Sequence, residues 1–384
     1  MAGLSTDEIM GIALEMAGMH HPPADSAIYV EGTGLSKVMF GIDIGTAELL
    51  LARQLGCDGV IAHHPAGGSA QLNFPEVLTR HVELMVEHGV SPTAARDAIQ
   101  SMMTRALLRA QSQNFDHVPS VARLLDMPFL NVHLPLDEVG RRIMVDTIGR
   151  HCESLGRPAS VQDAIDALLT LPEFANAPTR IMVPVGAVDR PLGRVAIVHG
   201  AGTNGGYAVA RTYYEHSIDT VLYIHVAPED AQRLRSDTRG NLIVSGHISS
   251  DMIGINQFVA KLEERGVEIV RMSGLEQWGT DQPAVEEANI EDAEPEQPVV
   301  AEENSPLRLL EPIVIPATIE TETGTEPEDV PEPAPGTSIR TDTQELPEVN
   351  VEETSSVPEG TAKLPSTVEM DEDEEPEAET PPPT

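Results

Sequence analysis

The stretch that decides the fold is residues 37–65, KVMFGIDIGTAELLLARQLGCDGVIAHHP. Its first part, Lys37–Ile44, is apolar and β-prone and predicts a strand. A helix pattern follows over Thr46–Leu55 and ends at Gly56, and Gly59–Ala62 predicts the next strand. A strand, a helix and a strand within about 25 residues are typical of a parallel sheet. We therefore expect an α/β fold.

The same arrangement returns later in the chain. Val195–Val198 predicts a strand, a glycine-rich turn and a helix follow, and Thr220–His225 predicts the next strand. Two such centres predict two similar α/β lobes with mixed or parallel sheets, at about residues 1–130 and 180–275. Between the two centres, residues 74–125 are expected to form a helical insertion.

Residues 276–384 differ in composition from the body formed by residues 1–275. They hold 31 of the 62 Asp and Glu residues and 17 of the 31 prolines, but only 3 of the 24 Lys and Arg residues. Such a segment buries too little apolar surface to offset its chain entropy. We expect a disordered acidic tail, of a kind that can bind a protein partner.

Composition also narrows the class of protein. A net charge of -38 repels phosphates, which argues against nucleic acid as a partner. Cys57 and Cys152 form neither a CxxC pair nor a disulfide framework, which fits a reducing cytoplasm. No apolar run reaches the roughly 18 residues of a membrane helix, and the acidic start of the chain is unlike a signal peptide. We expect a cytoplasmic protein without membrane contact.

The motif His63-His64-Pro65 stands at the end of a predicted strand. Ligands bind open parallel sheets at the carboxyl ends of strands, where adjacent imidazoles can each hold a different metal ion. Neutral imidazole suits Zn, Mn, Fe or Co. The same three letters occur at His20-His21-Pro22 after a helix, in a segment interpreted as a loop. The motif alone therefore leaves a pair of surface histidines open.

Two further histidine motifs also follow strand-like runs, one after Pro128–Val132 and one after Leu242–Val244. Each combines an imidazole with a carboxylate four residues later. A carboxylate near a helix start also has a purely structural explanation, as a cap or a dipole partner. Because all three motifs stand at strand ends, we expect one metal site in the cleft between the lobes. The two pairs are His133 with Asp137 and His247 with Asp251.

Three alternatives stay open at this point. Asp116 and Asp137 are rival carboxylate ligands in the stretch between the HHP motif and the last histidine motif. Asp137 is preferred because a strand precedes it. Gly200–Gly206 lies between a strand and a helix, where backbone amides can hold a phosphate, although tight-turn packing also explains the glycines. His225 either lies at the rim of the site or is a strand-end histidine without a role in it.

In this order the motifs resemble the NIF-three-like proteins, also known as GTP cyclohydrolase I type 2 homologues. Members show strand, helix, strand and HHP, then a HTxxD motif matched by His133 and Asp137, then a GHxxSE motif matched by residues 246–251. The resemblance covers residues 1–275 and implies a centre of two divalent metal ions and a ring-shaped homohexamer. The metal ligands that it implies are His63, His64, Asp137, His247 and Asp251.

The chain departs from the family pattern at two motif positions. Asp251 stands where the family has Glu, so its carboxylate is one methylene shorter and has less reach to bridge two ions. Leu134 replaces the Thr of HTxxD.

The leading hypothesis is a metal-dependent hydrolase with a small-molecule substrate, for which the resemblance suggests a nucleotide. Two ions about 3.5–4 Å apart lower the pKa of a bound water, and His133 or His225 can act as acid or base. The alternative is a non-catalytic metal-binding oligomeric assembly or a regulatory partner protein, which the acidic tail favours. Turnover on a nucleotide panel with added metal would separate the two.

Overall fold

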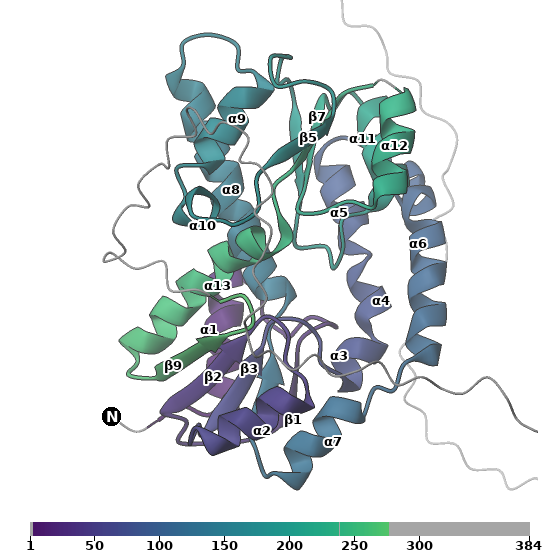
Figure 1. Ribbon diagram of the computed structural model, residues 1–384. Helices are drawn as coiled ribbons and strands as arrows, with labels where there is room; N and C mark the ends of the chain where they lie inside the picture. Colours follow the sequence, from purple (N-terminus) through teal and green to yellow (C-terminus); the bar gives the residue numbers. More distant parts are fainter. Residues whose placement is uncertain (1–2, 238, 276–384) are drawn as a thin grey trace, which may run out of the picture. The chain divides into compact units, whose positions relative to one another are not determined.

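The computed structural model describes residues 3–237 and 239–275. The expected disordered tail, residues 276–384, lies outside the described residues. The described chain is mixed α/β with two separate sheets (Figure 1), which confirms the predicted fold class. Within the described ranges, no helix combines the length and the apolar character that crossing a bilayer requires.

Five strands form the first sheet, in the order β1-β4-β3-β2-β9. Four of them run parallel, and β1 pairs antiparallel with β4 at one edge. The stretch at residues 37–65 supplies β2, α2 and β3, with Val38 opposite Gly59 and Phe40 opposite Ile61. The elements are β1 (Ala27–Val30), β2 (Lys37–Gly41), α2 (Thr46–Gln54), β3 (Gly59–Ala62), β4 (Phe129–Asn131) and β9 (Glu268–Met272).

Four strands form the second sheet, in the order β5-β8-β7-β6. Here too the strands β6, β7 and β8 are parallel, and β5 pairs antiparallel with β8 at the edge. The predicted second β-α-β unit is β6, α11 and β7. The elements are β5 (Met182–Val185), β6 (Val195–Val198), α11 (Gly206–Glu215), β7 (Thr220–Tyr223), α12 (Pro228–Asp237) and β8 (Asn241–Val244).

The last described strand belongs to the first sheet. β9 pairs with β2 along its whole length, from Lys37 opposite Glu268 to Gly41 opposite Met272. The expected second lobe of residues 180–275 therefore does not hold β9, because the free edge of β2 accepts a parallel strand. No local pattern in the sequence indicates which edge that strand joins. The division of the chain into lobes otherwise stays a prediction.

Two long helices connect the cores of the two sheets, α8 (Leu134–Ser154) and α13 (His247–Glu264). On α8, Leu136 packs in the core of the first sheet and Met144 in that of the second. The helices cross with almost no space between them, since a Cβ on Gly254 would lie 1.9 Å from the carbonyl oxygen of Leu136. Glycine is therefore required at this crossing, which sets the first turns of both helices side by side.

Both helices begin three residues after the strand that precedes them. α13 begins at His247, because Gly246 turns the chain with a φ of +106° shortly after β8. His247 and Asp251 therefore lie one turn apart on the same helix. α8 begins at Leu134, so that His133 is its N-cap residue and Asp137 lies in its first turn.

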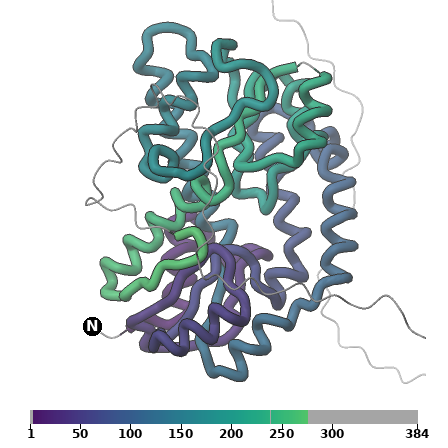
Figure 2. The backbone as a smooth tube through the Cα atoms, in the orientation of Figure 1, coloured from purple at the N-terminus to yellow at the C-terminus, as the bar shows by residue number. Residues whose placement is uncertain are grey.

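The helices between β3 and β4 contact both sheets (Figures 1 and 2). Met85 of α5 and Ile99 of α6 pack in the same core as Val198 of β6 in the second sheet, whereas Ala122 of α7 packs on the first. The helices are α3 (Gly68–Leu72), α4 (Phe74–Val77), α5 (Arg80–Glu87), α6 (Pro92–Ser112) and α7 (His117–Leu124). The remaining helices are α1 (Thr6–Ala17), α9 (Val161–Leu168) and α10 (Pro172–Ala175).

Candidate metal centre

A cluster of histidines and two aspartates forms where strands of both sheets end. His63 and His64 follow β3, and His133 follows β4, its parallel neighbour. From the second sheet, His199 follows β6. The carboxyl ends of parallel strands meet at one edge, so the topology of the first sheet brings His63, His64 and His133 together, and His199 approaches them from the second sheet.

The carboxylate of Asp251 lies at the centre of three imidazoles. Its Oδ2 atom is 3.3 Å from Nε2 of His247, 3.5 Å from Nε2 of His64 and 3.7 Å from Nε2 of His63. Because α13 begins immediately after β8, the i,i+4 spacing places His247 and Asp251 on the same face of its first turn. The shorter side chain of Asp251 still reaches both histidines of the HHP motif.

The carboxylate of Asp137 lies on the other side of His63. Its Oδ1 atom is 3.1 Å from Nε2 of His63 and 3.8 Å from Nε2 of His199, and its Oδ2 atom is 3.7 Å from Nε2 of His133. Asp137, His63 and His199 are all buried. The two aspartates thus place one carboxylate on each side of a single imidazole.

Three of the imidazoles are held by hydrogen bonds at Nδ1. His63 Nδ1 donates to the carbonyl oxygen of Val132 at 2.9 Å, and His64 Nδ1 lies 2.7 Å from Oδ1 of Asp43. His133 Nδ1 lies 2.7 Å from Oδ2 of the buried Asp25. Metal-bound histidines characteristically use the second nitrogen in this way, which fixes the ring and leaves Nε2 free.

The tautomer of His63 indicates that a cation belongs in the cluster. A carbonyl oxygen can only accept, so Nδ1 carries the proton of neutral His63 and Nε2 presents a lone pair. That lone pair faces a carboxylate oxygen of Asp137 at 3.1 Å. Two acceptors at this distance repel unless a proton or a metal ion lies between or beside them. Four buried atoms of the cluster lack any hydrogen-bond partner among the described residues: His63 Nε2, Asp137 Oδ1, His199 Nε2 and Asp251 Oδ2.

These donors fit a divalent metal ion. The cluster contains three groups of three residues, and in each group one ligand atom from each residue lies within 4.8 Å of those from the other two. The donors are imidazole nitrogens and carboxylate oxygens without a thiolate, a set that suits Zn, Mn, Fe or Co. The groups are His63, Asp137 and Asp251; His64, His247 and Asp251; and His63, His64 and His133.

The electrostatics keep both carboxylates ionised. Burial opposes ionisation of Asp137, but the neighbouring imidazoles, His133 foremost, hold the pKa of its carboxyl well below its usual range. The pKa of Asp251 is affected in the same direction, with His64 as the leading partner against burial. Burial also lowers the pKa of His247, which favours the neutral, metal-binding imidazole. Two buried negative charges of this kind require positive charge beside them.

Two of the residues considered from the sequence lie at different distances from this cluster. His225 follows β7, with its ring centre 4.8 Å from that of His247, and its Nδ1 lies 2.8 Å from the side-chain amide nitrogen of Asn204. Asp116 is half exposed and pairs with Arg123 at 2.6 Å, away from the histidines. The geometry therefore places Asp137, and not its rival, beside the HHP motif.

Sequence reasoning missed His199, Asp25 and Asp43. His199 follows a strand end like the other histidines, so the rule used for them would also have found it. Asp25 and Asp43 contact histidines that lie 108 and 21 residues away in the chain, and no local spacing indicates those contacts.

Comparison with known proteins now identifies the family. The family described as Duf34/NIF3 (NGG1p interacting factor 3) matches residues 29–275. This chain belongs to that family. A crystal structure of a NIF3 superfamily protein from Sphaerobacter thermophilus is 76% identical, with 72% of this chain and 100% of that chain covered and a TM-score of 0.71. The family suggested by the three sequence motifs is thereby confirmed.

More distant solved structures also match, at low identity. Reduced HcgD from Methanocaldococcus jannaschii is 11% identical, with 70% of this chain and 98% of that chain covered and a TM-score of 0.42. TTHA1606 from Thermus thermophilus is 17% identical over the same shares of the two chains, with a TM-score of 0.40. Among curated proteins, no match is found.

Proposed function

We propose that this Duf34/NIF3 protein is a hydrolase that uses two divalent metal ions, Zn, Mn, Fe or Co, to act on a small molecule. The observation that carries the proposal is the position of Asp251, whose Oδ2 atom is shared by two groups of three possible ligands. His63 and Asp137 complete one group, and His64 and His247 complete the other. Asp251 would then supply a ligand oxygen to both groups.

When bound, the two ions would lower the pKa of a water molecule and polarise the bond to be cleaved. The chain's own residues orient the reactants and move protons. His133, anchored to Asp25 through Nδ1, turns Nε2 toward Asp137 and can take up a proton there. If His225 accepts the amide hydrogen of Asn204 at Nδ1, it carries its own proton at Nε2 and can donate it to a leaving group.

The cluster opens into a cavity of about 360 Å³, a volume that suits a small molecule. His64, His133 and His247 line one part of it, and Pro65 and Phe74 provide apolar contact. The cavity walls thus hold four of the five proposed ligands, all but His63, and both proposed proton carriers, including His225. This arrangement supports chemistry on a ligand that enters the cavity.

Metal analysis together with a substrate screen tests the proposal. Protein purified without a histidine tag and reconstituted with Zn or Mn should hold between one and two ions per chain, since two groups of ligands share Asp251. The loaded protein should then hydrolyse a member of a panel of nucleotides and other small esters, and chelation should abolish the activity. Metal content below about 0.2 ions per chain would refute the metal centre. Metal binding without any turnover would favour a non-catalytic assembly.

We further propose, from the family resemblance alone, that the chain assembles into a homohexamer. Light scattering on the full chain would give the mass directly, and a monomeric mass would contradict it.

A further inference from the structure

The cavity at the metal centre continues into a second, larger one. The inner chamber is the cavity of about 360 Å³ that holds the histidines, and the outer chamber is a neighbouring cavity of about 800 Å³. The two share wall residues, so a ligand can extend from one into the other. The shared residues, which we call the junction, are Pro65, Phe74, Arg109, Gly202, Thr203 and His225.

One wall of the junction is a backbone loop between β6 and α11. Gly202 has a φ of +77°, and a Cβ there would lie 3.2 Å from the ring of Phe74 and 3.3 Å from Val77, so a side chain would be strained and crowded. The backbone N–H groups of residues 201–205 donate to no atom of the described residues. Free amides in such a glycine-rich turn form an anion-binding surface.

Another part of the wall carries two positive charges from α6. Arg105 and Arg109 lie one turn apart and both line the outer chamber, and Arg109 also lines the inner one. The guanidinium of Arg109 has no hydrogen bond or ion pair to any residue in the described part of the chain, whereas that of Arg105 donates to the hydroxyl of Ser101 at 2.8 Å. Among the residues that the structure describes, Asp230 is the one carboxylate on the outer wall, and it lies beside Gly206 rather than at the junction.

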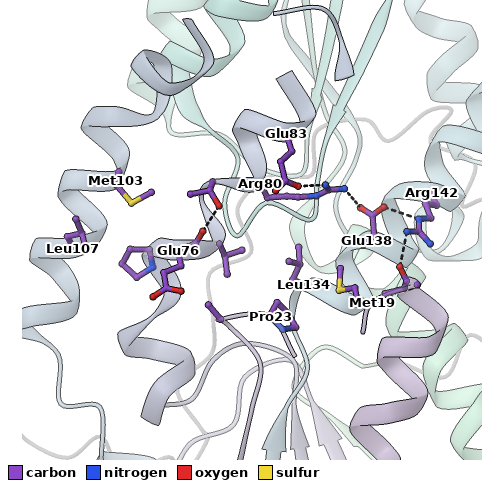
Figure 3. A pocket seen from close by; sticks show the side chains of 16 residues that line it. Met19, Pro23, Glu76, Arg80, Glu83, Met103, Leu107, Leu134, Glu138 and Arg142 are labelled. Carbon is purple, nitrogen blue, oxygen red and sulfur yellow. Dashed lines mark hydrogen bonds and ion pairs between the residues drawn. The ribbon is translucent and has the colours of Figure 1, made fainter. Parts of the chain in front are cut away.

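A third cavity, of about 810 Å³, provides a contrast because its arginines already have partners (Figure 3). Arg142 binds Glu138 at 2.9 Å, and Arg80 binds Glu83 at 2.5 Å and lies 3.6 Å from Glu138. Their charge is neutralised by carboxylates on the same wall. The arginines of this third cavity are thus neutralised, whereas Arg109 at the junction has no carboxylate partner among the described residues and lies near free backbone amides.

The inner chamber also holds an unpartnered buried group. His199 is 2% exposed, lines this chamber, and its Nε2 has no hydrogen-bond partner among the described residues. A polar atom buried in this way without a partner is costly, so a polar or metal-bound ligand group is needed beside it.

We infer that the junction is a phosphate-binding subsite and that the substrate is a small organic phosphate. This inference rests on the proposed function, because it names the substrate class of that centre. The phosphoryl group lies between the guanidinium of Arg109 and the amides of Gly202 and Thr203, with Arg105 adding charge from the next turn. The organic body occupies the outer chamber, where Phe74 and Leu78 offer apolar surface.

Binding of phenyl phosphate, measured by calorimetry, tests the subsite directly. The parent, in metal-loaded and metal-free forms, is compared with Arg105→Gln/Arg109→Gln and with Arg96→Gln, which lies on the same exposed helix but lines neither chamber. The double variant should bind about tenfold more weakly in both forms, because two charged donors are lost. Arg96→Gln should bind like the parent. Added KCl should weaken binding by the parent more than by the double variant.

The outcomes separate the subsite from the proposed function. In one outcome, phenyl phosphate binds through the arginines, but neither it nor any other member of the panel is hydrolysed. That outcome would disprove the hydrolase and support the subsite. Equal binding by the parent and the double variant, with metal content and circular dichroism unchanged, would overturn the subsite whatever the turnover. Parent protein that binds phenol as tightly as phenyl phosphate would also overturn it.

Discussion

Asp25 and His133 form a buried pair in which Oδ2 of the carboxylate lies 2.7 Å from Nδ1 of the imidazole. Burial lowers the pKa of His133, but the carboxylates of Asp137 and Asp25 outweigh it and raise that pKa to about 9. In metal-free protein the ring is therefore a cation at neutral pH. A metal ion that enters the site therefore competes with the proton on His133 for the negative charge of the carboxylates.

Asp25→Asn should lower the pKa of His133 in metal-free protein. The amide oxygen can still accept from Nδ1, so the ring keeps its position while one negative charge is lost. Burial, which lowers the pKa, is then opposed chiefly by Asp137. An NMR titration of the imidazole measures the change, and Asp7→Asn, on an exposed helix start, should leave it unaltered. A pKa that does not move in Asp25→Asn would contradict the charge pairing.

Asp137→Asn should reduce bound metal by about half or more with the fold intact, because one coordinating charge is lost beside His63. Asp116→Asn should leave metal content at the parent value, since Asp116 pairs with Arg123 on the surface. Elemental analysis with circular dichroism measures both. If the two variants behave the other way round, the third ligand has to be sought around Asp116.

His199→Leu should weaken metal binding by about tenfold, the scale seen when a group supporting a metal site is removed. The expected cause is loss of the imidazole whose Nε2 lies 3.8 Å from Oδ1 of Asp137. The readout is the rise in melting temperature on adding metal, which should shrink. His20→Leu, outside the site and exposed, should keep the full rise. A full rise in His199→Leu would exclude it from the centre.

His81 should make the protein less stable in mild acid. Burial lowers the pKa of this histidine to about 4, and both ring nitrogens lack a hydrogen-bond partner among the described residues. Above about pH 6.5 the ring is neutral in the folded and unfolded states alike. As the pH falls toward about 4, only the unfolded chain takes up the proton, so stability falls by about 3 kcal/mol. Denaturant unfolding of metal-free parent and His81→Leu should show a smaller acid loss in the variant, and equal losses would count against this assignment.

Two glycines in helix interiors should respond to alanine with opposite signs. Gly254→Ala places a methyl group against the carbonyl of Leu136 and should destabilise the fold by about 3 kcal/mol. It should also reduce metal content, because α8 and α13 carry Asp137 and Asp251. Gly149→Ala, with nothing within 4 Å, should stabilise by about 0.5–1 kcal/mol through helix propensity. Thermal unfolding distinguishes the two, and a stabilising Gly254→Ala would show that the helices can separate.

Local patterns could predict the central parallel strands and the strand-end histidines, but not the antiparallel edge strands β1 and β5. Runs such as Gly59–Ala62 are short and apolar, and the edge at which parallel strands end is a fixed property of the sheet. The start of α13 could not be predicted, because it depends on a positive φ at Gly246 rather than on a capping side chain. Contacts such as Asp25 with His133 are set by tertiary packing and leave no trace in spacing.

The pairing of β9 with β2 has a consequence for how the chain folds. Residues 37–41 leave the ribosome early, whereas their partner, residues 268–272, is made only after the whole second sheet. The edge of β2 therefore stays open during most of synthesis, and closing it is a long-range step of the kind that slows folding. An unpaired parallel edge is also a template for association with other chains. Chains that stop before residue 268 should aggregate for this reason, even though they already contain every residue of the proposed metal centre.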